Sequence, residues 1–151
     1  MSYFKLIRGI KKILDDDGRV NTITEGYVTD FDAYKQNISP MAHITVDNGT
    51  IDENLNFYSV EVMIVDIVVE NNNQTKEKFI GNDNHQEVFN NTDNIARRMF
   101  MIFKRDAVAQ DIFIQGTPAI DKIEETETQN RLAGWRLSFD VGVPTPEIDI
   151  C

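Results

Sequence analysis

The residues of this chain that could do catalytic or metal chemistry are two histidines, one cysteine and several groups of acids. His43 and His85 are far apart, and neither has a cysteine or a second histidine at the spacing of metal ligands. Cys151 has no histidine near it in the sequence that could activate it as a nucleophile. We therefore expect solvated or hydrogen-bonded histidines, a chance thiol and no metal site.

The acids give no catalytic or metal signal either. Glu124, Glu125 and Glu127 could supply paired carboxylates for acid–base work, but acids alternating with threonines are typical of an exposed strand. The aspartates at 15–17 lack the spacing of an EF-hand calcium loop, which favours a solvated turn. The motifs G-x-S-x-G and H-E-x-x-H and a glycine-rich phosphate loop are absent from the sequence. The sequence thus predicts neither an enzyme nor a cofactor.

One dense group of basic residues lies on one side of a helix predicted at 84–105. This basic group, which includes one methionine, consists of Arg97, Arg98, Met101, Lys104 and Arg105. Such a group is usually a solvated helix face, but on an acidic chain it could also receive an acidic partner. Four acids of the next segment could be that partner, within one subunit or between copies: Asp121, Glu124, Glu125 and Glu127.

Composition places these residues in one folded domain with an acidic surface. The chain has 151 residues, of which 41% are hydrophobic, enough for a single core. The formal net charge of −10 disfavours general binding to nucleic acid, because most of the surface repels phosphates. The N-terminal residues lack the uninterrupted apolar segment of a secretory signal, and no run is long enough for a membrane helix. We therefore expect cytosolic synthesis.

Two segments have the apolar spacing of amphipathic helices. The first covers 2–14, with Ser2 as N-cap and with the aspartates and Gly18 beyond its end. The second covers 84–105 and begins with a capping-box-like pattern. Each has an apolar side that can pack on a sheet.

Two strands are predicted in the first half of the chain. They cover 41–46 and 56–70, and Asp47-Asn48-Gly49 is a turn signal between them. The second strand becomes apolar on both faces, and we expect Asp66 within it to reach water or a backbone amide. The polar segment 47–57 would form a long hairpin tip, with five residues available for contacts: Asp47, Asn48, Asp52, Glu53 and Asn54.

The last strands form a hairpin over 119–143, preceded by a short strand at 111–115 and a Gly-Thr-Pro turn. Apolar residues alternate most regularly over 132–143, which would turn Trp135 toward the core. Prolines end this strand, and a tail at 144–151 follows. The order of helix, strands, helix and strands predicts one α+β domain with a mainly antiparallel sheet.

Two stretches of the sequence resemble small tail proteins of tailed bacteriophages of the kind that infect Bacteroidetes-type hosts. They are the ending N-R-L-A-G-W-R-L-S-F-D-V-G-V-P with its late cysteine, and H-Q-E-V-F-N-N-T-D-N-I-A-R-R in the second helix. The order of elements is also similar to that of tail terminator and tail completion proteins, in which a sheet carries an N-terminal helix and a second helix.

The resemblance implies a structural virion protein of the tail or neck, assembled in the host cytoplasm. Terminators of this family form a hexameric ring that caps the tail tube, ends its polymerisation and joins it to the head connector. The implied partners are further copies, the tail tube protein and a neck protein, with DNA passing through without specific binding and no membrane involved. The basic group of one subunit would then face the acids of the next, and the hairpin tip would contact the tube or connector.

Two other functions remain open from the sequence. One is a neck adaptor that binds the portal side. The other is a small monomeric binding module or enzyme, which would need a concave pocket. Oligomeric symmetry would separate these classes.

Overall fold

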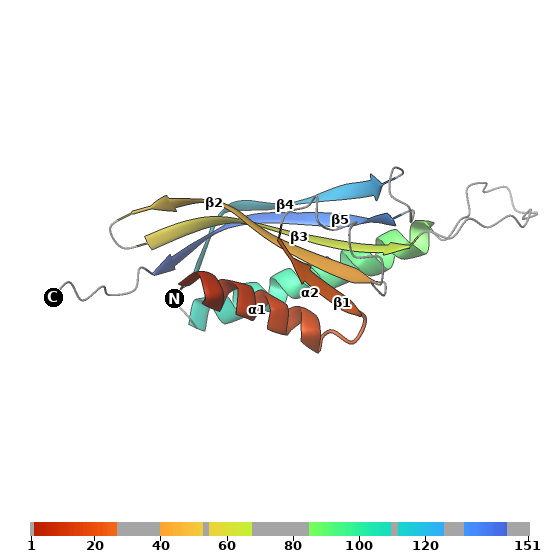
Figure 1. The fold of residues 1–151 in the computed structure, drawn as a ribbon, viewed down its shortest axis with the longest axis horizontal. Helices are drawn as coiled ribbons and strands as arrows, with labels where there is room; N and C mark the ends of the chain where they lie inside the picture. The colour runs from red at the N-terminus through yellow and green to blue at the C-terminus, as the bar shows by residue number, and fades with distance from the viewer. Residues whose placement is uncertain are drawn as a thin grey trace, which may run out of the picture.

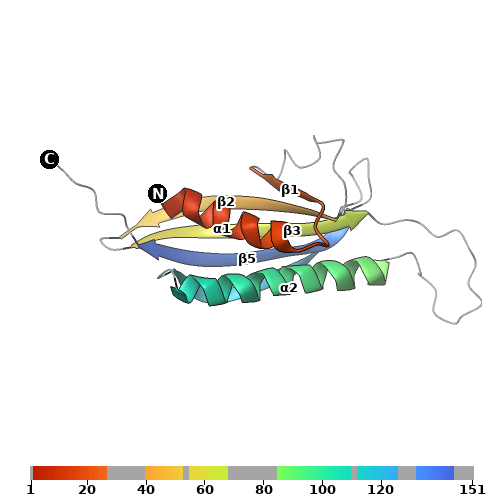
Figure 2. The same cartoon turned by 90° about the horizontal axis from the view of Figure 1, so that it is seen from below.

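The protein folds as one five-stranded sheet with two helices on the same face (Figures 1 and 2). The computed structural model describes residues 2–26, 40–52, 55–67, 85–109, 112–125 and 132–144. In chain order the elements are α1 (Ser2–Asp16), β1 (Thr22–Glu25), β2 (Met41–Ile51), β3 (Leu55–Ile67), α2 (His85–Ala109), β4 (Phe113–Glu125) and β5 (Leu132–Pro144). The predicted α+β class is confirmed.

The strands lie in the order β1-β2-β3-β5-β4, so β5 is inside the sheet and β4 forms one edge. All neighbours are antiparallel except β1 and β2, which are parallel. The predicted pairing of the last two strands is confirmed, with Ile120 opposite Leu137. β5 therefore lies between β3 and the edge strand β4.

The main core lies between the sheet and the two helices. Alternation along the strands turns Val62, Leu137 and Val141 toward the helices, where each is buried. The helices contribute one apolar side each, including Leu6, Ile10, Leu14, Ile95, Met99 and Phe103. Trp135 also faces α2, as predicted, and its indole N–H donates to the Phe89 carbonyl oxygen at 2.8 Å.

The outer face of the sheet, turned away from the helices, buries a smaller set of side chains. Met41, Val65 and Leu132 form an apolar cluster there. The strand β3 therefore buries apolar side chains on both of its faces. His43 is fully buried; its Nε2 lies 3.1 Å from the Gly26 carbonyl oxygen and its Nδ1 lies 2.7 Å from the Thr24 hydroxyl. A carbonyl can only accept, so Nε2 donates and Nδ1 accepts, and this ring is hydrogen-bonded as predicted.

Asp66 reaches a backbone amide, as predicted. Its carboxylate accepts from the Ile67 N–H at 2.7 Å. Burial raises the pKa of Asp66, the bond from Ile67 partly offsets this rise, and the charge of Glu87 adds to it. The predicted strand end at 68–70 lies outside the described residues.

The predicted turn at Asp47-Asn48-Gly49 is wrong. β2 continues through it to Ile51, and the register with β3 shifts between Asp47 and Gly49. A β-bulge absorbs the extra residue there, so the ladder with β3 resumes beyond it. The strands instead connect near Asp52, whose N–H bonds the Leu55 carbonyl oxygen at 3.0 Å, and the long hairpin tip at 47–57 is also wrong.

The predicted break between two strands at 116–118 is wrong as well. β4 runs from Phe113 to Glu125 as one strand, and an irregularity between Gln115 and Ala119 contains the Gly-Thr-Pro sequence. Gly116 has a φ of 72°, a conformation that glycine adopts without strain. The irregular segment therefore bends an edge strand without ending it.

Other boundaries also differ from the predicted ones. α1 reaches Asp16 and α2 reaches Ala109, both beyond the predicted ends at 14 and 105. β1 was not predicted, because its four residues contain one apolar side chain, Ile23, and so give no alternating pattern. The tail beyond Pro144 lies outside the described residues.

Candidate subunit interface

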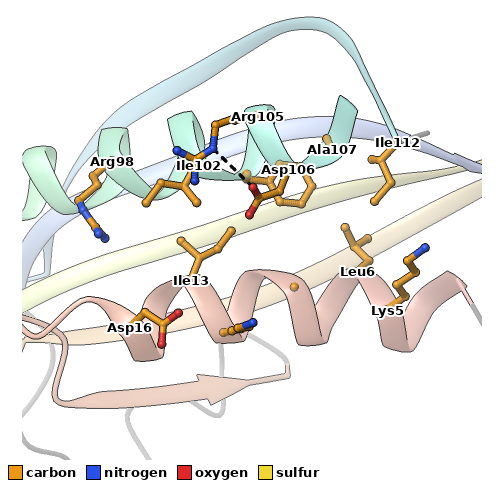
Figure 3. A pocket seen from close by; sticks show the side chains of 13 residues that line it. Lys5, Leu6, Ile13, Asp16, Arg98, Ile102, Arg105, Asp106, Ala107 and Ile112 are labelled. Carbon is orange, nitrogen blue, oxygen red and sulfur yellow. Dashed lines mark ion pairs between the residues drawn. The ribbon is translucent and has the colours of Figure 1, made fainter. Parts of the chain in front are cut away.

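The structure divides the basic group of α2 between two flanks of the helix. Arg97 and Met101 line a hollow beside β4. Arg98 and Arg105 instead line a groove between α2 and α1 (Figure 3). The four cations therefore do not form one undivided patch, because α2 lies between α1 on one side and β4 on the other.

On the β4 flank, a hollow of about 350 Å³ lies beside Arg97 and Met101. Arg97 makes an ion pair of 2.9 Å with Asp93, one helical turn earlier. Met101 is 65% exposed, although methionine is an apolar residue. Pro118, Ala119 and Ile120 of β4 form the other wall. This flank offers an apolar surface with a cation at its rim.

On the α1 flank, Arg98 contacts a buried carboxylate. Asp17 is only 6% exposed and accepts hydrogen bonds from the Arg19 Nε, the terminal guanidinium nitrogen and the backbone N–H at 2.9–3.0 Å. The Arg98 guanidinium lies 3.4 Å from the same carboxylate. The predicted solvated turn is therefore wrong for Asp17. Hydrogen bonds from Arg19, together with the charges of Arg19 and Arg98, hold the pKa of Asp17 below its usual 3.8 despite its burial.

Asp17→Asn should lower the free energy of unfolding at neutral pH by about 1–2 kcal/mol, because both arginines lose a charged partner. A lowered folded pKa stabilises the fold fully above the usual 3.8, and this contribution is lost as the pH falls through the folded value. Acidification below that value should therefore weaken the parent protein more than the variant. Urea unfolding at neutral pH and at a series of pH values below 3.8 measures both effects.

Asp16→Asn is the matched control, since Asp16 is the exposed neighbour at the end of α1. It should leave stability at neutral pH within about 0.5 kcal/mol of the parent. Equal losses for the two variants would contradict the special role of Asp17.

The groove between the helices has a volume of about 350 Å³ (Figure 3). Its floor is apolar: Ile13 of α1 lies across from Ile102 of α2, and Leu6 lies across from Ile112, near the other end of the groove (Figure 3). Six charged residues line it: Lys5, Lys12, Arg98 and Arg105, with Asp16 and Asp106 as the acids. Arg105 and Asp106 form an ion pair of 3.6 Å. The contribution of α1 was not predicted, although Lys5 and Lys12 share one side of that helix at a seven-residue spacing.

Asp121 of β4 does not face the basic group of its own chain. Ile120 lines the hollow beside α2, and the Lys122 amine lies 4.1 Å from the Phe89 ring centroid. Because side chains alternate along a strand, Asp121 between them points to the outer face. It lies opposite Arg136, which is itself 3.9 Å from Glu61. The sheet therefore separates Asp121 from Lys104.

The remaining predicted interface residues are only partly described. Glu124 and Glu125 belong to β4, where they pair with Ala133 and Leu132, and Glu127 lies outside the described residues. Among the described ion pairs none joins a basic residue of α2 to Asp121. Within the described residues, Asp121 is thus not paired with a basic residue of α2 in its own chain.

Three of the five residues predicted to contact a tube or connector are described, and they lie at one end of the sheet. Asp47 and Asp52 are exposed, Asn48 belongs to the bulged part of β2, and Glu53 and Asn54 lie outside the described residues. Ile51, beside them, is 90% exposed. Sequence reasoning missed this isoleucine because it placed the whole segment in a polar loop.

The chain matches no protein-family model and no curated protein. Within the described residues, no helix is long and apolar enough to cross a membrane. The described ranges also hold no group of three or more metal-ligating side chains.

Proposed function

We propose that this chain is a structural protein of a phage tail, a terminator whose copies close into a ring. The ring would cap the tail tube, end its polymerisation and join it to the head connector in the virion. One observation carries the proposal: α2, which carries the cations, lies on one face of the sheet, whereas Asp121 of the edge strand β4 points to the other face.

This separation favours contacts between copies over contacts within one copy. The sheet prevents Asp121 from reaching Lys104 of its own chain, so each chain displays both signs of charge on different surfaces. A surface that meets a different surface on the next copy is heterologous, and repeated heterologous contacts close a ring when the rotation allows it. The hexamer implied by the phage resemblance is such a ring.

The form of β4 supports contact through side chains rather than through strand addition. β4 is an edge strand, and such strands pair with other chains unless something prevents it. Here Pro118 and the irregular segment around Gly116 interrupt the edge, and Asp121 and Lys122 place charges along it. A neighbouring copy would therefore contact the side chains around the hollow beside Met101 and would not add a strand to β4.

The charge of the chain fits the proposed passage of DNA. Each copy carries a formal net charge of −10, so a ring of copies repels the phosphate backbone. DNA would then slide through the central channel without binding to it.

Charge reversal on each surface tests the ring. Lys104→Glu and Asp121→Lys should each weaken the oligomer at least ~10-fold, and the double variant should restore it, because opposite charges meet again. Native mass spectrometry measures the populations, with the ring at six times the 17.3 kDa of one chain. Arg98 is a poor choice here, because a glutamate would lie beside the buried Asp17 and affect folding.

Lys11→Glu is the matched control, because Lys11 is an exposed lysine on α1 that faces neither surface. It should leave the oligomer unchanged. The proposal fails if the parent chain remains monomeric both alone and in the presence of polymerised tail tubes. Binding to a portal ring in place of tubes would favour the neck adaptor.

A further inference from the structure

The groove between α1 and α2 has a lining of mixed apolar and cationic character in the described part of the chain. Its floor consists of Leu6, Ile13, Ile102 and other apolar side chains. Its four cations and two acids give it a formal excess of positive charge on a chain that is otherwise strongly acidic. An occupant should therefore be acidic and carry aliphatic side chains.

A glycine opens the middle of this groove. Gly9 lines the groove, and a Cβ atom added there would meet no other atom within 4 Å. The space above α1 is thus free at this point for a side chain from elsewhere. Gly9 and the apolar floor residues line the same groove, so an isoleucine or leucine would fit the chemistry there.

The segment that follows β5 has the complementary pattern. Its residues Glu147-Ile148-Asp149-Ile150 alternate acids with isoleucines. In an extended chain, alternate side chains point to opposite sides, so both isoleucines could face the floor while both acids face the rim. Lysine and arginine can rest their apolar stems on the walls and extend their charges to that rim.

The dimensions agree as well. Lys5 and Asp16 lie at the two ends of the groove wall on α1, and a helix rises about 1.5 Å per residue, which gives about 16 Å of wall. Four extended residues span about 13 Å. The acidic segment can therefore lie along the groove without bending.

We propose that the segment Glu147-Ile148-Asp149-Ile150 binds in the α1–α2 groove of a neighbouring copy. The proposal rests on the homo-oligomer proposed above and names a contact that links its subunits. Glu147 and Asp149 pair with the cations of the groove, and Ile148 and Ile150 cover its apolar floor.

The direction of the chain favours a neighbouring copy over the same copy. The end of β5 lies at the same end of the molecule as the start of α1 and the end of α2 (Figures 1 and 2). Val143 and Thr145 each precede a proline, and such residues favour extended backbone. Extended backbone at these two positions disfavours an immediate turn of the chain back along its own helices, which is the direction of its own groove.

Disulfide trapping tests this contact, because Cys151 is the only cysteine of the chain and follows the segment directly. Gly9→Cys places a thiol in the groove at a position with room for it. Mild oxidation with diamide should produce a ladder of covalent multimers on a non-reducing gel. Gly18→Cys is the matched control, since Gly18 is equally unobstructed but does not line the groove, and it should crosslink at least ~10-fold more slowly.

A charge-reversed segment separates docking from chance collision. Glu147→Lys with Asp149→Lys, added to the Gly9→Cys variant, should abolish the ladder. An intrachain disulfide without multimers would overturn the proposal, and so would equal ladders from Gly9→Cys and Gly18→Cys. The native mass of the parent protein reports separately on the ring: a ring without trapping would overturn this contact alone, and a monomer without trapping would overturn both.

Discussion

Gly134→Ala should destabilise this protein by about 3 kcal/mol or more, because the added methyl group has no space. Gly134 is buried within β5, where it pairs with Val65 of β3 and Ile123 of β4. An added Cβ would lie 1.9 Å from the Ile64 carbonyl oxygen and 2.8 Å from the Val65 Cα atom. Both atoms belong to the backbone of β3, so they can move only if the ladder between β3 and β5 deforms.

Gly9→Ala is the matched control for this substitution. Gly9 lies in the middle of α1 beside open space, so alanine should stabilise the helix by about 0.5–1 kcal/mol. Urea unfolding of both variants should thus shift the midpoint in opposite directions. An unchanged midpoint for Gly134→Ala would mean that β5 does not pass this close to β3.

The elements with strong periodicity were predicted from the sequence. Both helices and β5 have an apolar side that recurs at the helical or strand spacing, and burial of that side against one sheet determined how they pack. Trp135 faces the core for the same reason. Where one whole side of a helix or strand must be buried, the spacing of its apolar residues predicts both the element and the side that faces the core.

Turn residues misled the prediction at two places where a strand continues. Asp47-Asn48-Gly49 and the Gly-Thr-Pro sequence at 116–118 both have the composition of turns. In each case the partner strand continues to pair beyond the irregularity, so a register shift replaces the turn. Turn composition is a local signal. It does not indicate whether the two strands pair again several residues later.

The surroundings of the candidate interface depended on contacts far apart in the sequence. Arg98 is exposed, as predicted for the basic side of its helix, but its contact with Asp17 from the end of α1 was not predicted. That contact exists only because the two helices pack side by side on the sheet. The sequence identified the charged residues of α2, whereas the division of those residues between two flanks required the structure.

Phe139→Ala should lower the free energy of unfolding by about 3–5 kcal/mol. Phe139 of β5 is 4% exposed, and its ring centroid lies 5.4 Å from that of Phe100 and 5.2 Å from that of Phe103. Its removal leaves a cavity between β5 and the second half of α2 and breaks both aromatic contacts. Urea unfolding measures the loss, and Phe139→Leu, which keeps most of the volume, should lose about 1–1.5 kcal/mol.

The loss should be local as well as global, because α2 contacts β5 near its start as well as in its second half. Near its start, Phe89 accepts the hydrogen bond from the Trp135 indole, and this contact does not involve Phe139. Hydrogen exchange in Phe139→Ala should therefore accelerate most in the half of α2 that carries Lys104 and Arg105, with less change around Phe89. The proposed ring places charges from that half at its interface, so the same variant should also form fewer rings at temperatures where it remains folded. Rings that persist while the second half of α2 exchanges freely would show that this half of the helix lies away from the contact between copies.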